Sequence, residues 1–280
     1  MVSSVQRAPA TKGSDERFEL LDELVRYDFP PQTPTVGSDA EVWRATDLLT
    51  GDTVAIKIMP IDRVGDGDLR DRLRNEALVG ARLSILHSNI LPVRDLGMLG
   101  RRLFIVTDWI EDSSLQRRCG RLSLQECVTI VTQCGNALRT VHAEGVLHTD
   151  ICPHNILYVK KERRALIADF GLATAVDGHA EWLGRDVAVH RRPAYLPPPG
   201  HPAHPPPINT ALDTYALAMT FRALLTGKEE PIKEDEELVV TYTGHPVPTR
   251  LVDLVHRYTI TGKSDDTAER FTRDLWRAIG

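Results

Sequence analysis

The spacing of apolar residues changes near residue 112, and this change restricts the possible folds more than any other feature of the chain. Before it, residues 40–47 ("AEVWRATD") and 53–59 ("TVAIKIM") have strand character on either side of a turn at Gly51-Asp52. Residues 69–86 have apolar positions three and four apart, which predicts a helix. Residues 90–110 return to strand character around a turn.

After residue 112 the pattern is mostly helical. Ser123, followed by Glu126 three residues later, predicts a capped helix that ends at Gly145, and residues 212–227 form a second, apolar helix. Strands first and helices second predict an α+β fold. We expect a flexible tail at residues 1–17 and one domain at 18–280, with a β-rich part at about 18–111 and a helical part at about 112–280.

Charge and cysteine spacing exclude several classes of protein. The formal net charge of −5 gives no overall basic field, so no nucleic acid partner is expected. An uncharged apolar run of about 18 residues is absent from the sequence, so no membrane association is expected. The four cysteines show no zinc-ligand spacing and are expected to be buried or semi-buried thiols of a cytoplasmic protein.

Five short motifs follow one another along the chain. They are "VAIK" (54–57), "RNEALVG" (74–80), "HTDICPHNIL" (148–157), "IADFGLA" (167–173) and "DTYALAM" (213–219). Through them, from about Phe29 to Phe271, the chain resembles a protein kinase catalytic domain of the bacterial Ser/Thr type. The resemblance implies a two-lobed fold with a small β-rich N-lobe and a larger, mainly helical C-lobe.

The resemblance also implies which residues carry the chemistry. Lys57 matches the lysine that binds phosphate, and Glu76 matches its ion-pair partner on the following helix. Asp150 matches the aspartate that accepts or orients the proton of the substrate hydroxyl. Asp169 and Asn155 match the two ligands of Mg²⁺, which prefers hard oxygen donors. ATP and Mg²⁺ are therefore the expected cofactors.

The resemblance implies a glycine-rich loop that covers the nucleotide near the N-terminal end of the domain. Only Gly37 of the family's three loop glycines is kept, with Thr35 and Ala40 at the other two positions, so weaker nucleotide binding is expected. Val42, Ala55 and Leu157 match the apolar residues that sandwich adenine. Thr107 matches the gatekeeper, and Asp108 to Ile110 match the hinge whose backbone reads the adenine edge.

Two further matches are structural. His148 is expected to pack against Phe170 rather than to carry a proton. Asp213 matches a buried aspartate that ties the catalytic loop through its main-chain N–H groups. Its position at the start of a helix would also suit a simple N-terminal carboxylate.

Four positions depart from the family pattern. Thr149 replaces the arginine that clamps a phosphorylated residue, and between Gly171 and Tyr195 only Thr174 has a Ser or Thr hydroxyl. We therefore expect no activation by phosphorylation of this segment. Cys152 replaces the lysine that contacts the transferred phosphoryl group, and Arg192 or Arg191 is a candidate substitute.

The other two departures concern substrate preference and the end of the segment. His154 stands at a position where many kinases have a glutamate that recognises a basic residue of the substrate, so little such preference is expected. Pro199 stands where a glutamate would pair with an arginine matched by Arg270, and a proline-stiffened segment is the expected substitute.

Three functions remain open. The first is an active Ser/Thr protein kinase with a protein substrate of unknown identity. The second is a pseudokinase that binds nucleotide or a partner without turnover, which Cys152 and the reduced glycine loop favour. The third is a small-molecule phosphotransferase of the aminoglycoside-kinase type, which uses a similar loop without the lysine. The oligomeric state is left open.

Overall fold

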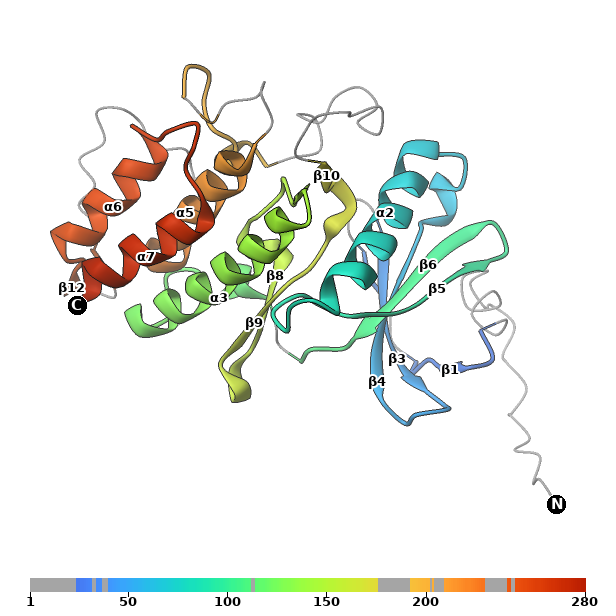
Figure 1. Ribbon diagram of the computed structural model, residues 1–280. Helices are drawn as coiled ribbons and strands as arrows, with labels where there is room; N and C mark the ends of the chain where they lie inside the picture. Colours follow the sequence, from blue (N-terminus) through green and yellow to red (C-terminus); the bar gives the residue numbers. More distant parts are fainter. Residues whose placement is uncertain are drawn as a thin grey trace. The chain divides into compact units, whose positions relative to one another are not determined.

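The computed structural model describes residues 24–31, 34–36, 40–111, 114–175, 192–201, 203, 209–229, 241–242 and 245–280. The chain divides into two compact units (Figure 1). The first consists of Met1–Arg70 and Asp95–Trp109, and the second of Asp71–Arg94 and Ile110–Gly280. The expected tail at 1–17 lies outside the described residues.

The first unit is built on a six-stranded sheet with the order β1-β3-β4-β6-β5, in which β2 also pairs with β3. The pairs β1–β3, β2–β3, β3–β4 and β4–β6 are antiparallel. The strands are β1 (Tyr27–Asp28), β2 (Thr35–Val36), β3 (Glu41–Asp47), β4 (Thr53–Ile58), β5 (Val93–Leu99) and β6 (Arg102–Asp108).

The two faces of this sheet differ in burial because side chains alternate along each strand. One face forms an apolar core that includes Trp43, Ile56 and Val106, which lie side by side through the pairs Trp43↔Ile56 and Ile56↔Val106. The opposite face is less buried on β3 and β4, where Val42 and Lys57 are partly exposed partners. The sheet therefore has one face free of the core on which polar chemistry can be placed.

The second unit is mainly helical. Its helices are α2 (Gly67–Ser84, whose first turn belongs to the first unit), α3 (Leu124–Ala143), α5 (Thr210–Thr226), α6 (Thr249–Thr259) and α7 (Ala268–Ile279). Among its described residues, short strands pair as β8 (Ile156–Val159) with β9 (Arg164–Ile167), β7 (Val146–Leu147) with β10 (Thr174–Ala175), and β11 (Thr241–Tyr242) with β12 (His245–Pro246). The 3₁₀ turns of the chain are 61–63, 115–118, 153–155, 160–162, 170–172 and 193–195.

Local sequence signals account for the ends of these helices. Ser123 and Glu126 form the expected capping box at the start of α3, each accepting a hydrogen bond from the other residue's main-chain N–H. α5 is capped at its start by Asn209, whose side chain accepts from Ala211 N, and at its end by Gly227, which has a φ of 75°. Fifteen residues of α5 are buried, so this helix is the centre of the unit's core and not an amphipathic surface helix.

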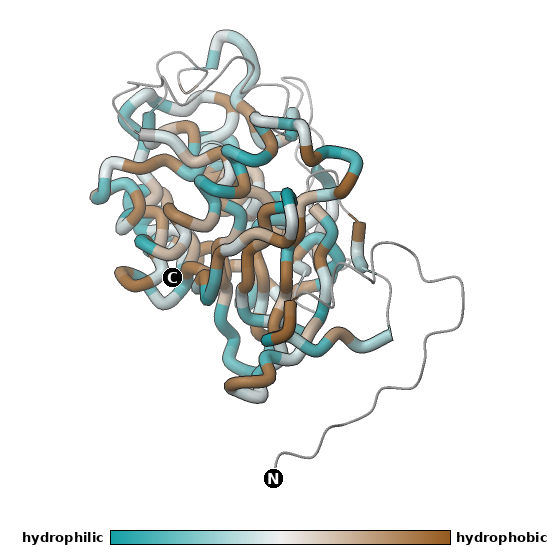
Figure 2. The backbone as a smooth tube through the Cα atoms, turned by 90° about the vertical axis from the view of Figure 1, so that its right-hand side faces the viewer, coloured by the Kyte–Doolittle hydropathy of each residue, from teal (hydrophilic) through white to brown (hydrophobic). Residues whose placement is uncertain are grey.

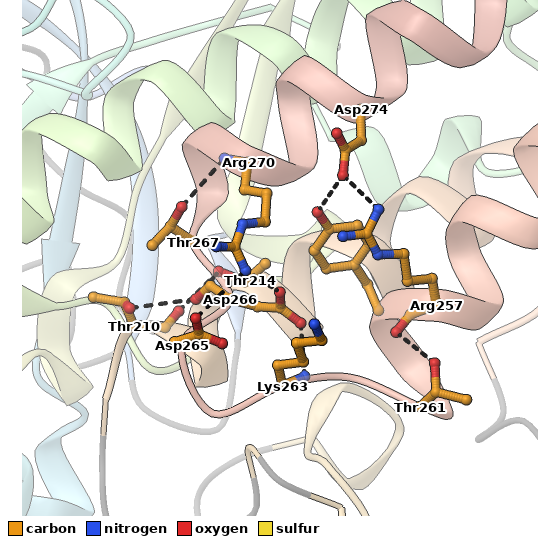
Figure 3. A network of polar contacts seen from close by, with 11 residues as sticks. Thr210, Thr214, Arg257, Thr261, Lys263, Asp265, Asp266, Thr267, Arg270 and Asp274 are labelled. Atoms are coloured by element: carbon orange, nitrogen blue, oxygen red, sulfur yellow. Dashed lines mark hydrogen bonds and ion pairs between the residues drawn. The ribbon is translucent and has the colours of Figure 1, made fainter.

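A polar network joins the start of α5 to the start of α7 (Figure 3). The main-chain carbonyl of Asp266 accepts hydrogen bonds from the hydroxyls of Thr210 and Thr214. Its buried carboxylate accepts from Lys263 N at 2.7 Å and from the guanidinium of Arg270 at 3.3 Å. Arg270, which lacks its family partner, is thus paired within its own region.

The α+β fold class is confirmed, with the sheet and the helical unit in the expected order along the chain. Residues 71–94, expected in the β-rich part, group with the helical unit, because Asn75 of α2 donates to Phe170 O and Asn89 donates to Ala165 O. Short hydrophobic and hydrophilic runs of residues follow one another along the described backbone (Figure 2). Among the described residues no helix is long and apolar enough to cross a membrane.

Candidate active site

A buried carboxylate on α5 anchors the loop that carries Asp150. Asp213 accepts hydrogen bonds from the main-chain N of His148 at 2.8 Å and of Thr149 at 2.7 Å. Nε2 of His142 lies 2.8 Å from the same carboxylate. Burial is the largest single influence and would raise the pKa of Asp213, but the hydrogen bond and charge of His142 and the charge and main-chain N–H of His148 together outweigh it, so the pKa lies below its ordinary value. Asp213 therefore stays ionised and fixes the loop.

Asp150 is held by Asn155. The Nδ2 group of Asn155 donates to the Asp150 carboxylate at 2.6 Å and to the Asp150 carbonyl at 2.9 Å. Burial raises the pKa of the Asp150 carboxyl to about 6, and the charge of Asp169 acts in the same direction, whereas His148, Asn155 and Arg192 lower it. The side chain is therefore an anion at neutral pH, yet basic enough to take a proton.

The β8–β9 hairpin brings Asn155 and Asp169 to one end of the same pair of strands. Asn155 directly precedes β8, and Asp169 lies two residues beyond the end of β9. Ile156 pairs with Ile167, and Ala168 N donates to Asn155 O at 2.8 Å. Two residues that are distant in the sequence are thus placed at one hairpin end by strand register.

The backbone at Asp169 adopts the left-handed conformation, with φ of 64°. Its carboxylate accepts a hydrogen bond from Gly171 N at 3.4 Å and caps the following 3₁₀ turn. A non-glycine residue in this region is uncommon and is retained when its surroundings fix it. The left-handed backbone and this cap together define the conformation of the turn at Asp169.

The donor set at this end suits Mg²⁺. Nδ2 of Asn155 is used twice by Asp150, which leaves its amide oxygen Oδ1 as the atom for a metal ion. Asp169 supplies a carboxylate. Mg²⁺ is usually held by one or two carboxylates together with water and substrate phosphates, so this small oxygen set fits it. The described residues contain no group of three or more His, Cys, Asp or Glu side chains, the arrangement that a zinc-type site would need.

His148 has a structural position, as expected. Its ring is fully buried and lies 4.7 Å from the ring of Phe170, measured between centroids. Nδ1 accepts from Asp150 N at 3.3 Å, so Nε2, which lies 3.1 Å from Ala168 O, carries the proton. Both ring nitrogens contact main-chain groups, so His148 has a structural role and does not transfer a proton.

On the sheet of the first unit, four predicted nucleotide-binding residues share one face. Val42 is the cross-strand partner of Lys57, and Ala55 is the partner of Thr107. Lys57 and Ala55 lie two residues apart on β4, so their side chains point the same way. All four are partly exposed, unlike the core face. The register thus brings these four residues together within this unit.

The other predicted residues are distributed as follows. Asp108 pairs with Val54 at the end of β6. Glu76 lies on α2, Leu157 on β8, and Ile110 begins the second part of the second unit. Gly37 and Arg191 lie outside the described residues.

The sequence alone did not reveal the contacts that three residues, Asn75, Thr149 and His142, make in this site. The amide of Asn75 on α2 donates to the carbonyls of Phe170, Gly171 and Ala173, the hydroxyl of Thr149 donates to the carbonyl of Leu172, and His142 contacts Asp213. A polar residue next to Glu76 and a histidine in the last turn of α3 are common surface features. Neither position has a sequence pattern that would predict these contacts.

Comparison with known families decides the identity of the fold. The family described as "Protein kinase domain" matches residues 36–273. The chain belongs to the protein kinase family. The loop that carries Asp150 and the Asp169-Phe170-Gly171 turn both lie within the matched residues, at the positions of the family's catalytic loop and D-F-G turn.

Bacterial Ser/Thr kinases are among the similar proteins. The serine/threonine-protein kinase PknA of Mycobacterium tuberculosis is 33% identical over 231 residues, which are 78% of this chain and 51% of PknA. PknH of Mycobacterium bovis is 31% identical over 218 residues, 76% of this chain and 35% of PknH. The chain thus corresponds to between a third and a half of these curated relatives' length.

A solved kinase domain supports the fold independently. The crystal structure of the Mycobacterium tuberculosis PknI kinase domain has a TM-score of 0.65 at 23% identity, covering 90% of this chain and 96% of PknI's. At this identity the likeness concerns the fold alone. It agrees with the division into a sheet unit and a helical unit.

Cys152, which replaces the lysine, and Arg192, its candidate substitute, both lie in the second unit. Burial raises the pKa of the Cys152 thiol to about 12, so this side chain is neutral and supplies no positive charge to a phosphate. Arg192 is exposed at the start of the 193–195 turn. Its positive charge lowers the pKa of Asp150, of Cys152 and of His154, which places all three within its electrostatic reach.

Proposed function

We propose that this chain is an active protein kinase that transfers the γ-phosphoryl group of ATP to a Ser or Thr hydroxyl of a protein. The observation that carries the proposal is the Asp150 carboxylate, which Asn155 holds in a buried loop and whose pKa is about 6. A carboxylate that accepts a hydroxyl proton must be ionised at neutral pH and held in a fixed orientation, and Asp150 meets both conditions. A cytoplasmic location belongs to the same proposal and rests on the cysteine pattern alone.

The proposed step is a single displacement. The substrate hydroxyl oxygen forms a bond to the γ-phosphorus while the bond from that phosphorus to the β,γ-bridging oxygen breaks, and ADP leaves with the electron pair. Asp150 orients the hydroxyl and takes its proton. Asn155 keeps the carboxylate from turning away, and Asp213 holds the loop so that the geometry is set before the substrate arrives.

Asn155 and Asp169 are the proposed holders of Mg²⁺. When bound, the ion supplies positive charge that neutralises the phosphate oxygens. Lys57 is proposed to bind phosphate with Glu76 as its ion-pair partner, and both roles come from the motif match. Gly37 is proposed to cover the nucleotide, and adenine recognition is proposed for Val42, Ala55, Thr107, Asp108, Ile110 and Leu157.

We further propose that phosphorylation of the 171–195 segment does not activate this kinase. Thr174, its only Ser or Thr, is 8% exposed and pairs with Leu147 in the β7–β10 ladder. Its hydroxyl is therefore poorly accessible to another kinase. Thr149, in place of the arginine, supplies no cation for a phosphate.

Arg192 is the proposed substitute for the lysine that Cys152 replaces. Its guanidinium is exposed, and its charge acts on both Asp150 and Cys152. Arg192→Ala should lower the turnover number by about tenfold or more, and an unchanged turnover number would refute this role. His154 is a half-buried imidazole whose pKa is lowered by burial and by Arg192, which supports little preference for a basic residue.

A pseudokinase is the second candidate, and the neutral, buried Cys152 favours it. Such a protein would bind nucleotide through the same residues without turnover. A small-molecule phosphotransferase would transfer phosphate to a small acceptor and not to protein.

The deciding experiment uses γ-labelled ATP with Mg²⁺, alone and with a generic protein acceptor. Wild type is compared with Asp150→Ala, Asp169→Ala and, as a control, Asp62→Ala, which changes an exposed carboxylate of the first unit. Transfer that the first two variants abolish and the control retains establishes a working kinase. No transfer, with nucleotide still bound, replaces the proposal with the pseudokinase. Labelled small molecules without labelled protein would point to the third function.

A further inference from the structure

The four residues that follow Asp169 are held by side chains from two sides. On one side lies α2, whose Asn75 donates through Nδ2 to Phe170 O at 3.1 Å, Gly171 O at 3.4 Å and Ala173 O at 3.0 Å. An amide group has only two hydrogens, so these three contacts share them. α2 is thereby tied to the D-F-G turn next to Glu76.

On the other side lies the catalytic loop. The hydroxyl of Thr149 donates to Leu172 O at 2.6 Å, and Thr149 is only 4% exposed. Its own N–H is bound by Asp213. With Asn75, this contact supplies a side-chain donor to every main-chain carbonyl from Phe170 to Ala173.

The backbone of Thr149 shows how firmly this contact is determined. Its φ is 69°, a left-handed conformation that a β-branched residue rarely adopts. Such a conformation persists only when neighbouring contacts over-determine it. The bonds to Asp213 and Leu172 supply that determination.

Packing leaves the segment little freedom. A side chain at Gly171 would meet the Asp169 carboxylate at 3.2 Å and the main-chain oxygen of Arg72 on α2 at 3.4 Å. Immediately after the segment, Thr174 pairs with Leu147. The segment is thus enclosed by α2, the catalytic loop and the β7–β10 ladder.

We propose that Asn75 and Thr149 are positioning residues that hold Phe170–Ala173, and with it Asp169, in place without any phosphorylated residue. This inference rests on the proposed function and names the regulation of the same site. In kinases with the arginine, a phosphorylated residue would connect the catalytic loop to the segment after Asp169. Here the hydroxyl of Thr149 connects them directly through Leu172 O. The kinase should therefore be active as synthesised.

The test compares Thr149→Val, which keeps the branched shape but removes the hydroxyl, with Thr149→Ser, which keeps the hydroxyl. Asn75→Ala removes the second donor. Thr132→Val is the matched control, because the Thr132 hydroxyl on α3 has no hydrogen-bond partner among the described residues. Asn136→Ala, at an exposed position of α3, controls for the asparagine change.

Two readouts are needed. Amide hydrogen exchange of a peptide covering 170–175 should be at least about tenfold faster in Thr149→Val and Asn75→Ala than in wild type. Peptides from α6 and α7 should be unchanged. The turnover number should fall by roughly tenfold to a hundredfold in both variants with the KM for protein substrate little affected, because a misplaced Asp169 weakens chemistry more than substrate binding. Thr149→Ser should recover most of both properties.

The outcomes separate this inference from the proposed function. Exchange in Thr149→Val equal to that of the Thr132→Val control would overturn the inference, even if wild type is an active kinase. Wild-type activity that requires a phosphorylated residue in the 171–195 segment, detected by mass spectrometry, would also overturn it. If wild type transfers no phosphate, the proposed function fails, but faster exchange in Thr149→Val would still support the positioning role.

Discussion

The side-chain amide of Asn155 holds Asp150 at two points, with Nδ2 lying 2.6 Å from the carboxylate oxygen Oδ2 and 2.9 Å from the main-chain carbonyl oxygen. One asparagine thus fixes the orientation of the proposed proton acceptor through Nδ2, which leaves Oδ1 for its proposed role as a metal ligand. The two roles can be separated by substitution.

Asn155→Ala removes both roles, whereas Asn155→Asp keeps an oxygen for the metal but removes the donor. We expect both variants to lose about a hundredfold or more in turnover. The aspartate variant should also shift the acid limb of the pH profile upward, because a second carboxylate next to Asp150 favours its protonated form. Steady-state kinetics from pH 5 to 8 measures both effects. An Asn155→Asp variant with wild-type turnover would contradict the holding role.

The pH dependence of wild type follows from the pKa of Asp150. Because the ionised form accepts the proton, kcat/KM should fall as the pH drops below about 6. Arg192→Ala should move this limb to higher pH, since the charge of Arg192 lowers the pKa of Asp150. The substrates are the same in both profiles, so a difference between them reports on the enzyme. Superimposable profiles would show that Asp150 and Arg192 do not interact.

Asp150→Asn should abolish transfer and stabilise the metal-free protein. The folded-state pKa of about 6 lies above the value of about 3.9 for an unfolded Asp, so the ionised carboxylate costs stability at pH 7. The cost is smallest below about pH 4 and is fully present above about pH 6. The asparagine variant should gain on the order of 1–3 kcal/mol at pH 7 and lose this advantage as the pH falls. Denaturant unfolding at pH 7 and 5 would show it, with Asp62→Asn as the exposed control.

Glu41 and Arg102 form a buried ion pair in the first unit, with NH2 of Arg102 lying 2.6 Å from the carboxylate and both residues no more than 5% exposed. Arg102→Met should cost about 3–5 kcal/mol of unfolding free energy, because it leaves Glu41 buried without a partner. The double variant Glu41→Leu with Arg102→Met should recover much of this loss.

The neighbouring Arg101 is exposed and provides the control, because Arg101→Met should change the unfolding free energy by less than about 0.5 kcal/mol. Guanidinium unfolding of the four proteins would complete the comparison. A double variant as unstable as Arg102→Met alone would show that the loss comes from the bond between Nε of Arg102 and the carbonyl of Met59.

Much of the fold was predictable because its signals are local. The capping box of Ser123 and Glu126, the strands on either side of Gly51 and the apolar helix that begins near Leu212 each depend on residues close in sequence. The four cysteines are free thiols, three of them buried and Cys119 partly buried, which agrees with the expected buried or semi-buried thiols.

The motif order was also sufficient to predict the family and the α+β fold. It placed Asp150 and Asn155 in one loop, five residues apart, and the structure shows them hydrogen-bonded. Asp169 joins them at one end of the β8–β9 hairpin, whose strands are joined by only a short turn.

Other features depended on packing between distant segments. The bond from Asn75 to Phe170 spans 95 residues, and those from Asp213 to the catalytic loop span 64 and 65. The sequence showed Thr149 only as a missing arginine, whereas the fold gives its hydroxyl an acceptor in the main-chain carbonyl of Leu172. Local patterns indicate which elements form, because helix hydrogen bonds, caps and the alternation of side chains along a strand depend on neighbours in the chain. Which side chain satisfies a given buried carbonyl is decided only when helices and loops pack together, because the partner is chosen by distance in space.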